Sequence, residues 1–197
     1  MDDRSALTLH LVGNIPGILR HIKKQFGGEP AFRQYNRDLL VFVADIARGP
    51  LFTEAALRQR GLDFDMACPM AEATTERLFR SGNMQITHDG LLGHVDSTGF
   101  WPSHLLLMDW FWDNNPLLRI EGELVVGIPT RGELLFSDTA KLPLIPMLMQ
   151  EVGLKNENGP HRLSGRLFVR REGAFVPYAF GSQQGAPGKK WWAFWKK

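Results

Sequence analysis

Residues 117–138 read LLRIEGELVVGIPTRGELLFSD and predict two extended segments joined by a tight turn. The first part, residues 117–128, has the apolar content of a long strand, and Leu134–Phe136 is expected to return beside it as an antiparallel partner. The Pro-Thr-Arg-Gly sequence at 129–132 supplies the proline and glycine that favour a turn. This segment therefore predicts a sheet whose strands lie beside their neighbours in sequence.

Flanking segments add strands and helices to this pair. Apolar alternation and short β-branched runs predict strands at 7–12 and 38–44, a weaker extended segment at 51–57, and hairpins over 84–92 and 163–180, with turns at 88–90 and 172–173. Helical spacing and terminator residues predict helices at 18–26, 71–80, 102–112 and 142–152. Runs of strands with helices between them indicate an α+β fold. We expect a single domain with a largely antiparallel sheet, two or three packed helices and a flexible C-terminal tail.

Composition bounds the class of protein. The chain has 197 residues, 44% of them hydrophobic and 22% charged, which is typical of one globular domain. A single cysteine excludes an intrachain disulfide. There is no apolar run of about 18 residues that would predict a membrane-spanning helix. The start, Met-Asp-Asp-Arg, lacks the pattern of a signal peptide, so the expected compartment is the cytoplasm.

The net charge of +2 divides unevenly along the chain. Four lysines lie in residues 189–197, so residues 1–188 keep 19 Lys+Arg against 21 Asp+Glu, a formal −2. The eight residues just before the tail, 181–188 (GSQQGAPG), are polar and glycine-rich, as in flexible linkers. The sequence therefore predicts an α+β domain over 1–180, a linker over 181–188 and a basic aromatic tail over 189–197.

The tail is the sharpest functional candidate. It places aromatic residues between two pairs of lysines: Lys189, Lys190, Trp191, Trp192, Phe194, Trp195, Lys196 and Lys197. Tryptophan favours surfaces where one side of the ring is apolar and the N–H stays wet, and lysine favours anionic headgroups. This composition predicts contact with a protein partner or with an anionic membrane surface, at the inner face of the membrane. The competing interpretation is that the aromatic residues fold back on their own domain.

A second candidate surface is the segment Leu105–Trp112, in which seven of eight residues are apolar or aromatic. A helix that is apolar nearly all round is either central or covered by a partner. Burial inside the domain is the favoured interpretation. The alternative makes Trp110 and Trp112 part of a partner surface or of a homodimer interface.

Catalytic signals are weak. There is no phosphate-binding loop, nucleophile elbow or zinc-ligand spacing, and no cofactor or metal is predicted. Polar residues do gather between Asp89 and His104, and a hydrolase-like enzyme is one alternative function, with His94, Asp96, Ser97 and His104 as its candidate residues. Cys68, before a proline, is expected to be a buried, inert thiol.

A nucleic-acid-binding protein is a further alternative, through stacking by the tail aromatics and the charges of Arg166, Arg170 and Arg171. However, no dense basic run occurs in residues 1–188, and this argues against a nucleic-acid footprint.

The segment Ser97–Asp138 resembles the YtpQ-like family of bacterial proteins, to which no activity is assigned. The residues that carry the resemblance are GFWPSHLLL at 99–107 and IEGELVVGIPTRGELLFSD at 120–138, and the hairpin at 163–180 looks like the C-terminal strands of that family. The resemblance implies an intracellular bacterial domain, and it implies no catalytic role for any residue. The aromatic tail lies outside the shared core.

Together these features favour a non-enzymatic binding or adaptor protein of the bacterial cytoplasm. Its expected contacts are the tail and, as an alternative, the segment Leu105–Trp112.

Overall fold

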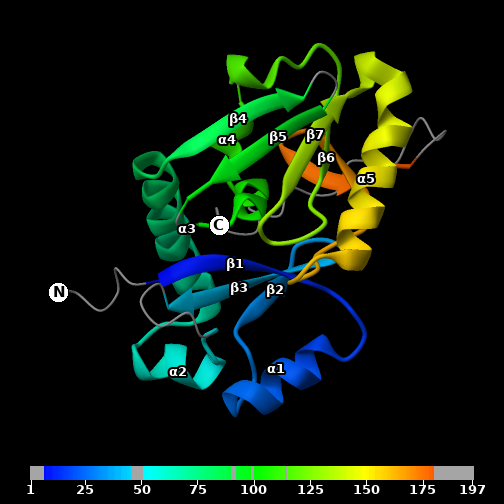
Figure 1. The fold of residues 1–197 in the computed structure, drawn as a ribbon. Coiled ribbons are helices and arrows are strands. Elements are labelled where there is room, and N and C mark those ends of the chain that lie inside the picture. Colours follow the sequence, from blue (N-terminus) through cyan, green and yellow to red (C-terminus); the bar gives the residue numbers. More distant parts are fainter. Residues whose placement is uncertain (1–6, 46–50, 90–91, 99, 114, 180–197) are drawn as a thin grey trace. The chain divides into compact units, whose positions relative to one another are not determined.

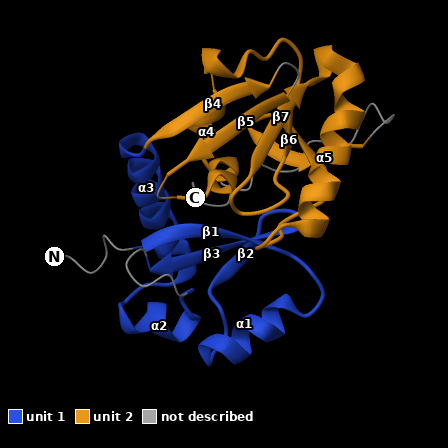
Figure 2. Ribbon diagram, in the orientation of Figure 1, with its two compact units in different colours: residues 1–82 blue, residues 83–197 orange. Residues whose placement is uncertain are grey.

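The computed structural model describes residues 7–45, 51–89, 92–98, 100–113 and 115–179 (Figure 1). The chain divides into two compact units, Met1–Gly82 and Asn83–Lys197, each with its own sheet (Figure 2). Helices and antiparallel sheets together confirm the α+β class. The sequence predicted one domain over 1–180. The boundary between the two units, at Gly82–Asn83, has no linker-like composition, because a long helix leads there directly into a strand.

The first unit contains a three-stranded antiparallel sheet of β1 (Leu7–Gly13), β2 (Phe32–Gln34) and β3 (Leu39–Asp45), in the order β1-β3-β2. The strands predicted at 7–12 and 38–44 are confirmed. Every residue of the central strand β3 is buried. A run without polar alternation, such as LLVFVAD, is typical of a strand that is covered on both faces.

Helix α1 (Ile18–Phe26) confirms the predicted helix at 18–26. It ends at Gly27, whose φ of 71° is a left-handed conformation that glycine adopts without strain. Two lysines in its last turn favour the negative end of the helix dipole. On its inner side, Ile22 packs against Val12, Leu40 and Phe42 of the sheet.

Two predictions in the first unit are wrong in part. The segment at 51–57 was expected to be extended, but it contains α2 (Glu54–Gln59), because the Thr53 hydroxyl accepts a hydrogen bond from the Ala56 N–H and caps a helix. The helix predicted at 71–80 is α3 (Phe64–Ser81) and begins seven residues earlier. Asp63 caps its start, and Pro69, near that start, removes only one backbone hydrogen bond.

The second unit contains a six-stranded antiparallel sheet in the order β4-β5-β7-β6-β8-β9. Its strands are β4 (Met84–Asp89), β5 (Leu92–Ser97), β6 (Leu124–Gly127), β7 (Leu134–Asp138), β8 (Leu167–Arg171) and β9 (Ala174–Pro177). The pairing of β6 with β7, and the hairpins β4–β5 and β8–β9, were all predicted. Glu172 and Gly173 form the turn between β8 and β9 with positive φ at both positions, as expected.

Several strands are shorter than predicted. The long strand expected at 117–128 is confirmed only for β6, because Pro116–Leu118 forms a 3₁₀ turn and Arg119 is left-handed, with a φ of 53°. The turn expected at 88–90 lies later, since β4 continues through Asp89 and residues 90–91 lie outside the described residues. The last strand, expected at 175–180, ends at Pro177.

The helix predicted at 102–112 is interrupted. A 3₁₀ helix, Pro102–Leu107, is followed by α4 (Asp109–Trp112), with a non-helical Met108 between them. The favoured interpretation, burial within the unit, agrees with the structure: Trp112 is 6% exposed and its Nε1–H donates to the Leu105 carbonyl at 2.6 Å. Its ring contacts Phe175 of β9 edge to face, and Trp110 is half-buried.

The helix predicted at 142–152 is α5 (Ile145–Asn158), preceded by the 3₁₀ segment Thr139–Leu144. Ile145, Leu148 and Val152 recur at helical spacing and pack against one face of the sheet, with Val125 of β6 among their contacts. Burial of each such side chain contributes about 1.5–3 kcal/mol. This packing fixes which side of α5 faces away from the sheet.

The sheet also has a close approach that excludes a side chain. Gly93 of β5 lies opposite Phe136 of β7, and a Cβ at Gly93 would be only 2.1 Å from the ring of Phe136. We expect Gly93→Ala to lower the free energy of unfolding by about 1–3 kcal/mol, because the ring must move out of its packed position. The matched control is Gly153→Ala in α5, where a new Cβ meets nothing within 4 Å. This control is expected to stabilise the protein by about 0.5–1 kcal/mol. Urea unfolding of both variants measures the difference, and equal stabilities would contradict this account.

Candidate functional site

The structure places the candidate residues of a hydrolase-like site on both faces of β5 and in a neighbouring 3₁₀ helix. His94 and Asp96 lie two residues apart on β5 and therefore point to one face of the sheet, whereas Ser97 points to the other. The Ser97 hydroxyl donates to the Phe100 carbonyl at 2.6 Å. His104 is buried in the 3₁₀ helix Pro102–Leu107. Within the described ranges, no group of three or more His, Cys, Asp or Glu residues is arranged to hold a metal ion.

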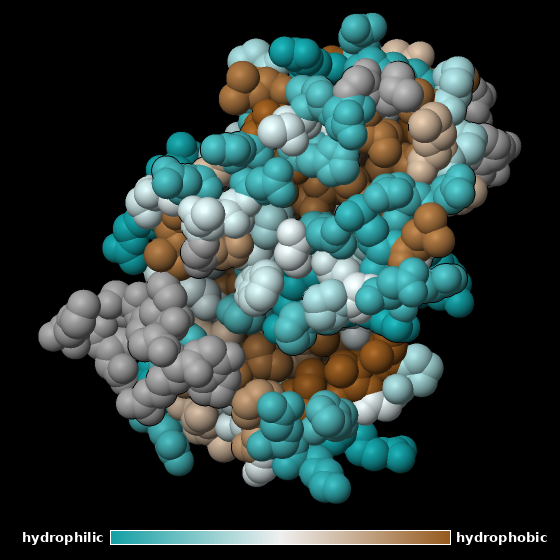
Figure 3. Space-filling model, viewed as in Figure 1, coloured by the Kyte–Doolittle hydropathy of each residue, from teal (hydrophilic) through white to brown (hydrophobic). Residues whose placement is uncertain are grey.

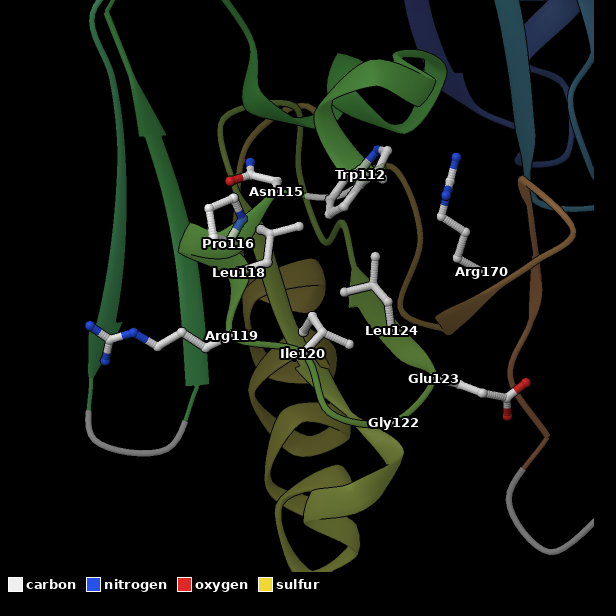
Figure 4. A pocket seen from close by; sticks show the side chains of 10 residues that line it. All are labelled: Trp112, Asn115, Pro116, Leu118, Arg119, Ile120, Gly122, Glu123, Leu124 and Arg170. Carbon is white, nitrogen blue, oxygen red and sulfur yellow. The ribbon is translucent and has the colours of Figure 1, made fainter.

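One pocket in the second unit, of about 540 Å³, lies beside the 3₁₀ turn Pro116–Leu118 (Figure 4). Leu118, Ile120 and Leu124 lie in its middle, and Trp112 and Asn115 lie at one end. In Figure 4 the charged side chains of Arg119 and Glu123 extend away from these apolar residues. The lining of this pocket is therefore mixed, with an apolar centre and polar groups from Asn115, Glu123 and Arg170 around it.

Two arginines around this pocket form ion pairs that connect distant segments of the second unit. Arg170 donates to Asp113 at 2.6 Å and to Asp109 at 2.9 Å, and so ties both ends of α4 to β8. Arg171 forms a two-bond ion pair with Glu123, and this pairing raises the Arg171 pKa. The alternative in which Arg170 and Arg171 contact nucleic acid would require these groups to leave internal ion pairs.

Asp138, at the end of β7, organises the loop that borders the pocket. Its side chain is fully buried and accepts hydrogen bonds from the backbone N–H groups of Ala140, at 2.8 Å, and of Glu121, at 3.5 Å. The Lys141 ammonium lies 3.3 Å away. One carboxylate thus joins the loop before β6 to the 3₁₀ segment after β7.

A different surface of the second unit has the character of a binding site. Four apolar side chains on or just before α5 are about half exposed or more: Leu142 at 60%, Met147 at 47%, Met149 at 48% and Leu154 at 49%. Met147 and Leu154 lie about two turns apart on one side of α5, opposite its buried side. Figure 3 shows brown residues interrupting the teal surface along α5. We call Met147 and Leu154, together with Trp101, the α5 surface. Leu142 lies before the helix, and Met149 lies about 140° around the helix from Leu154.

Trp101 joins this surface through a second pocket, of about 630 Å³, which is also lined by Leu154 and His161. The Trp101 side chain is 40% exposed, and its ring centroid lies 6.0 Å from that of His161. His161 adopts a φ of 51°, a conformation that is uncommon outside glycine. An indole ring and a leucine side chain therefore line the pocket, and such a lining suits apolar or aromatic ligands.

A polar rim borders the same pocket. Lys155 of α5 donates to Glu133 at 2.5 Å and lies 3.7 Å from Glu151. The hydrogen bond to Glu133 raises the Lys155 pKa. Because one ammonium serves two carboxylates, the rim keeps a net negative charge. An apolar centre with a charged rim is the usual anatomy of a protein interface.

The α5 surface was not predicted, although the sequence carried a signal for it. Residues 142–152 hold more apolar side chains than one buried face of a helix can use, as Leu105–Trp112 does. In that segment the structure buries Trp112 and half-buries Trp110. The tail candidates at 189–197 and the linker at 181–188 lie outside the described residues.

In comparisons with known proteins, no family model, no curated protein and no solved structure matches the chain. The resemblance to the YtpQ-like family stays a prediction. None of the helices in the described part of the chain has both the length and the apolar character that crossing a bilayer requires.

We expect Asp138→Ala to lower the free energy of unfolding by about 2–4 kcal/mol, because it removes a helix cap and leaves two backbone N–H groups without their acceptor. Asp96→Ala is the control, since Asp96 is exposed on β5, and a change within about 0.5 kcal/mol is expected there. Urea unfolding followed by circular dichroism gives both values. A loss at position 138 no larger than the control would contradict this role for Asp138.

Cys68 lies in α3 and is buried, as predicted. Burial raises its pKa to about 12, with Glu72 adding to the shift. The thiolate fraction at pH 8 is therefore on the order of 1 in 10,000. We expect almost no reaction with a thiol reagent in the native protein at pH 8, and one full equivalent in guanidinium chloride. Rapid native labelling would show that the thiol is accessible.

Proposed function

We propose that this chain is a non-enzymatic binding protein whose α5 surface docks an apolar, aromatic-bearing segment of a partner protein. The observation that carries the proposal is the second apolar side of α5, which remains exposed after its first side is buried against the sheet. When a partner covers such a side chain, removal of its apolar surface from water contributes about 25 cal/mol of binding free energy per Å².

The side chains of the surface support a protein ligand. Methionine is flexible and polarisable and adapts to ligands of different shape, as at other versatile binding surfaces. Trp101 supplies a rigid aromatic anchor beside a pocket, which is the usual composition of an interface hot spot. The rim of Glu133, Glu151 and Lys155 adds polar groups that can fix the direction of a bound peptide.

An enzymatic reaction has less support, since His94 and Ser97 point to opposite faces of β5 and His104 is buried. The contact of the tail with an anionic membrane and a homodimer through Trp110 both stay predictions.

The proposal predicts that the α5 surface selects peptides from an unbiased library. A displayed library of random peptides is panned against the full chain, and in parallel against a full chain with Trp191→Ala, Trp192→Ala and Trp195→Ala. We expect the selected peptides to contain two or more aromatic or large apolar residues. Met147→Glu with Leu154→Glu should weaken their binding more than about tenfold, because each change places a charge in the contact.

The matched control is Met66→Glu with Leu117→Glu, which introduces the same charge at apolar positions exposed to a similar degree outside the surface. Binding to the control should stay within about twofold, a difference of less than 0.5 kcal/mol. Fluorescence anisotropy of a labelled selected peptide measures each Kd, and circular dichroism checks that the variants fold. Failure to select any peptide on either chain, or equal loss in both double variants, would contradict the proposed function.

A further inference from the structure

We infer that the chain supplies an occupant for its own α5 surface: the basic aromatic tail, residues 189–197, folds back onto α5 of the same molecule and competes with the partner. This inference rests on the proposed function, because it takes the α5 surface to be a docking site for aromatic-bearing segments. It adds the identity of an intramolecular ligand and a means by which partner binding is regulated.

The described chain ends beside α5. Val176 and Tyr178 pack against the core cluster that Ile145, Leu148 and Val152 of α5 help to form. The Tyr178 N–H donates to the Leu167 carbonyl at 2.9 Å, which holds this last segment on the sheet. In Figure 1 the orange end of the chain lies next to the yellow helix α5. The last described residues therefore lie at the core cluster that α5 helps to form.

The length of the linker suits an intramolecular contact. Trp191 follows the last described residue, Ala179, by 12 residues, which span at most about 40 Å when extended. Helix α5 has 14 residues and is therefore about 21 Å long. The whole α5 surface lies within reach. A short flexible linker also gives an effective concentration on the order of millimolar, so that weak contacts suffice.

The chemistry of the two partners is complementary. The tail brings Trp191, Trp192 and Trp195, and aromatic rings make favourable contacts with methionine sulfur of the kind that Met147 exposes. The pocket of about 630 Å³ beside Trp101 has the aromatic and leucine lining that an indole ring requires.

Charge supports the same pairing. The four lysines of the tail carry +4. Helix α5 carries Glu151 and Glu157 against Lys155, and Glu133 lies beside it in an ion pair with that lysine. The guanidinium of Arg162 donates to the Glu157 carbonyl, so these five groups together carry a formal charge of −1. The acidic rim therefore attracts the basic ends of the tail, while the apolar centre takes its aromatic residues.

The consequence is built-in competition. A partner can bind only to molecules whose tail has left the α5 surface. Its apparent Kd therefore equals its intrinsic Kd divided by the fraction of molecules with an undocked tail. Removal of the tail aromatics is expected to tighten the binding of a library-selected peptide, and an anionic surface that draws the lysines away would have the same effect.

Disulfide trapping in the full chain tests the inference directly. One variant combines Leu154→Cys on α5 with Ala193→Cys in the tail, and the control combines Leu117→Cys with Ala193→Cys. Leu117 is 63% exposed, so its thiol is at least as accessible as that at position 154. Cys68 is buried and does not compete for the new thiols. Mild oxidation is followed on non-reducing gels and by mass spectrometry of the linked peptides.

We expect the Leu154→Cys pair to form an intramolecular disulfide about tenfold faster than the control pair, because docking raises the local concentration of the tail. Changing Trp191, Trp192 and Trp195 to alanine should abolish this difference. Equal rates in the two pairs would overturn the inference, since an undocked tail meets both positions by random collision. Disulfides only between molecules would also overturn it.

The two proposals fail in different ways. If library peptides bind the α5 surface but the two disulfide rates are equal, the proposed function stands and tail docking is rejected. If no peptide binds either chain while the Leu154→Cys pair still forms preferentially, the tail is a part of the fold and the proposed function is rejected.

Discussion

The second unit depends on burial of its sheet from both sides at the β6–β7 pair. Val125 packs against α5, whereas its neighbour Val126 points to the other face, where it pairs with Phe136 and Phe168 in adjacent strands. All four side chains are buried. A sheet with no polar alternation needs a cover on each face, because exposure of either would cost about 25 cal/mol per Å² of apolar area. The aromatic segment Pro102–Trp112 and helix α5 are both consequences of this need.

The same need explains why α5 is a candidate binding element. Its inner side requires only three residues, Ile145, Leu148 and Val152, to complete the core. Solubility alone would favour polar residues elsewhere on the helix, yet Met147, Met149 and Leu154 remain exposed. We propose that contact with another segment accounts for these exposed apolar side chains. In this respect α5 differs from Leu105–Trp112, where nearly all the apolar residues are buried within the unit.

Electrostatics serves the architecture of this unit more than its recognition of ligands. Arg170 holds α4 through Asp109 and Asp113, and Asp138 joins two loops through its buried carboxylate. These groups are placed by tertiary contacts between residues far apart in the sequence. A count of basic residues along β8 therefore overstates the charge that is available to a nucleic acid. The pocket rim at α5 carries two carboxylates, Glu133 and Glu151, against the one ammonium of Lys155, and the tail carries four lysines.

The α+β class, the pairing of β6 with β7, the turn at Glu172–Gly173 and the burial of Cys68 were predictable from the sequence alone, because periodicity, turn residues and composition are local signals. The start of α3 is also set locally, by the Asp63 cap three residues before Met66, although the sequence predicted a later start. The short length of β6 and the break at Met108 depend on tertiary contacts, namely anchoring by Asp138 and packing of the aromatic segment. Tertiary structure also decided the candidate site. An apolar helix reads the same in sequence whether its second side is covered or exposed, and only the packing of its neighbours distinguishes the two.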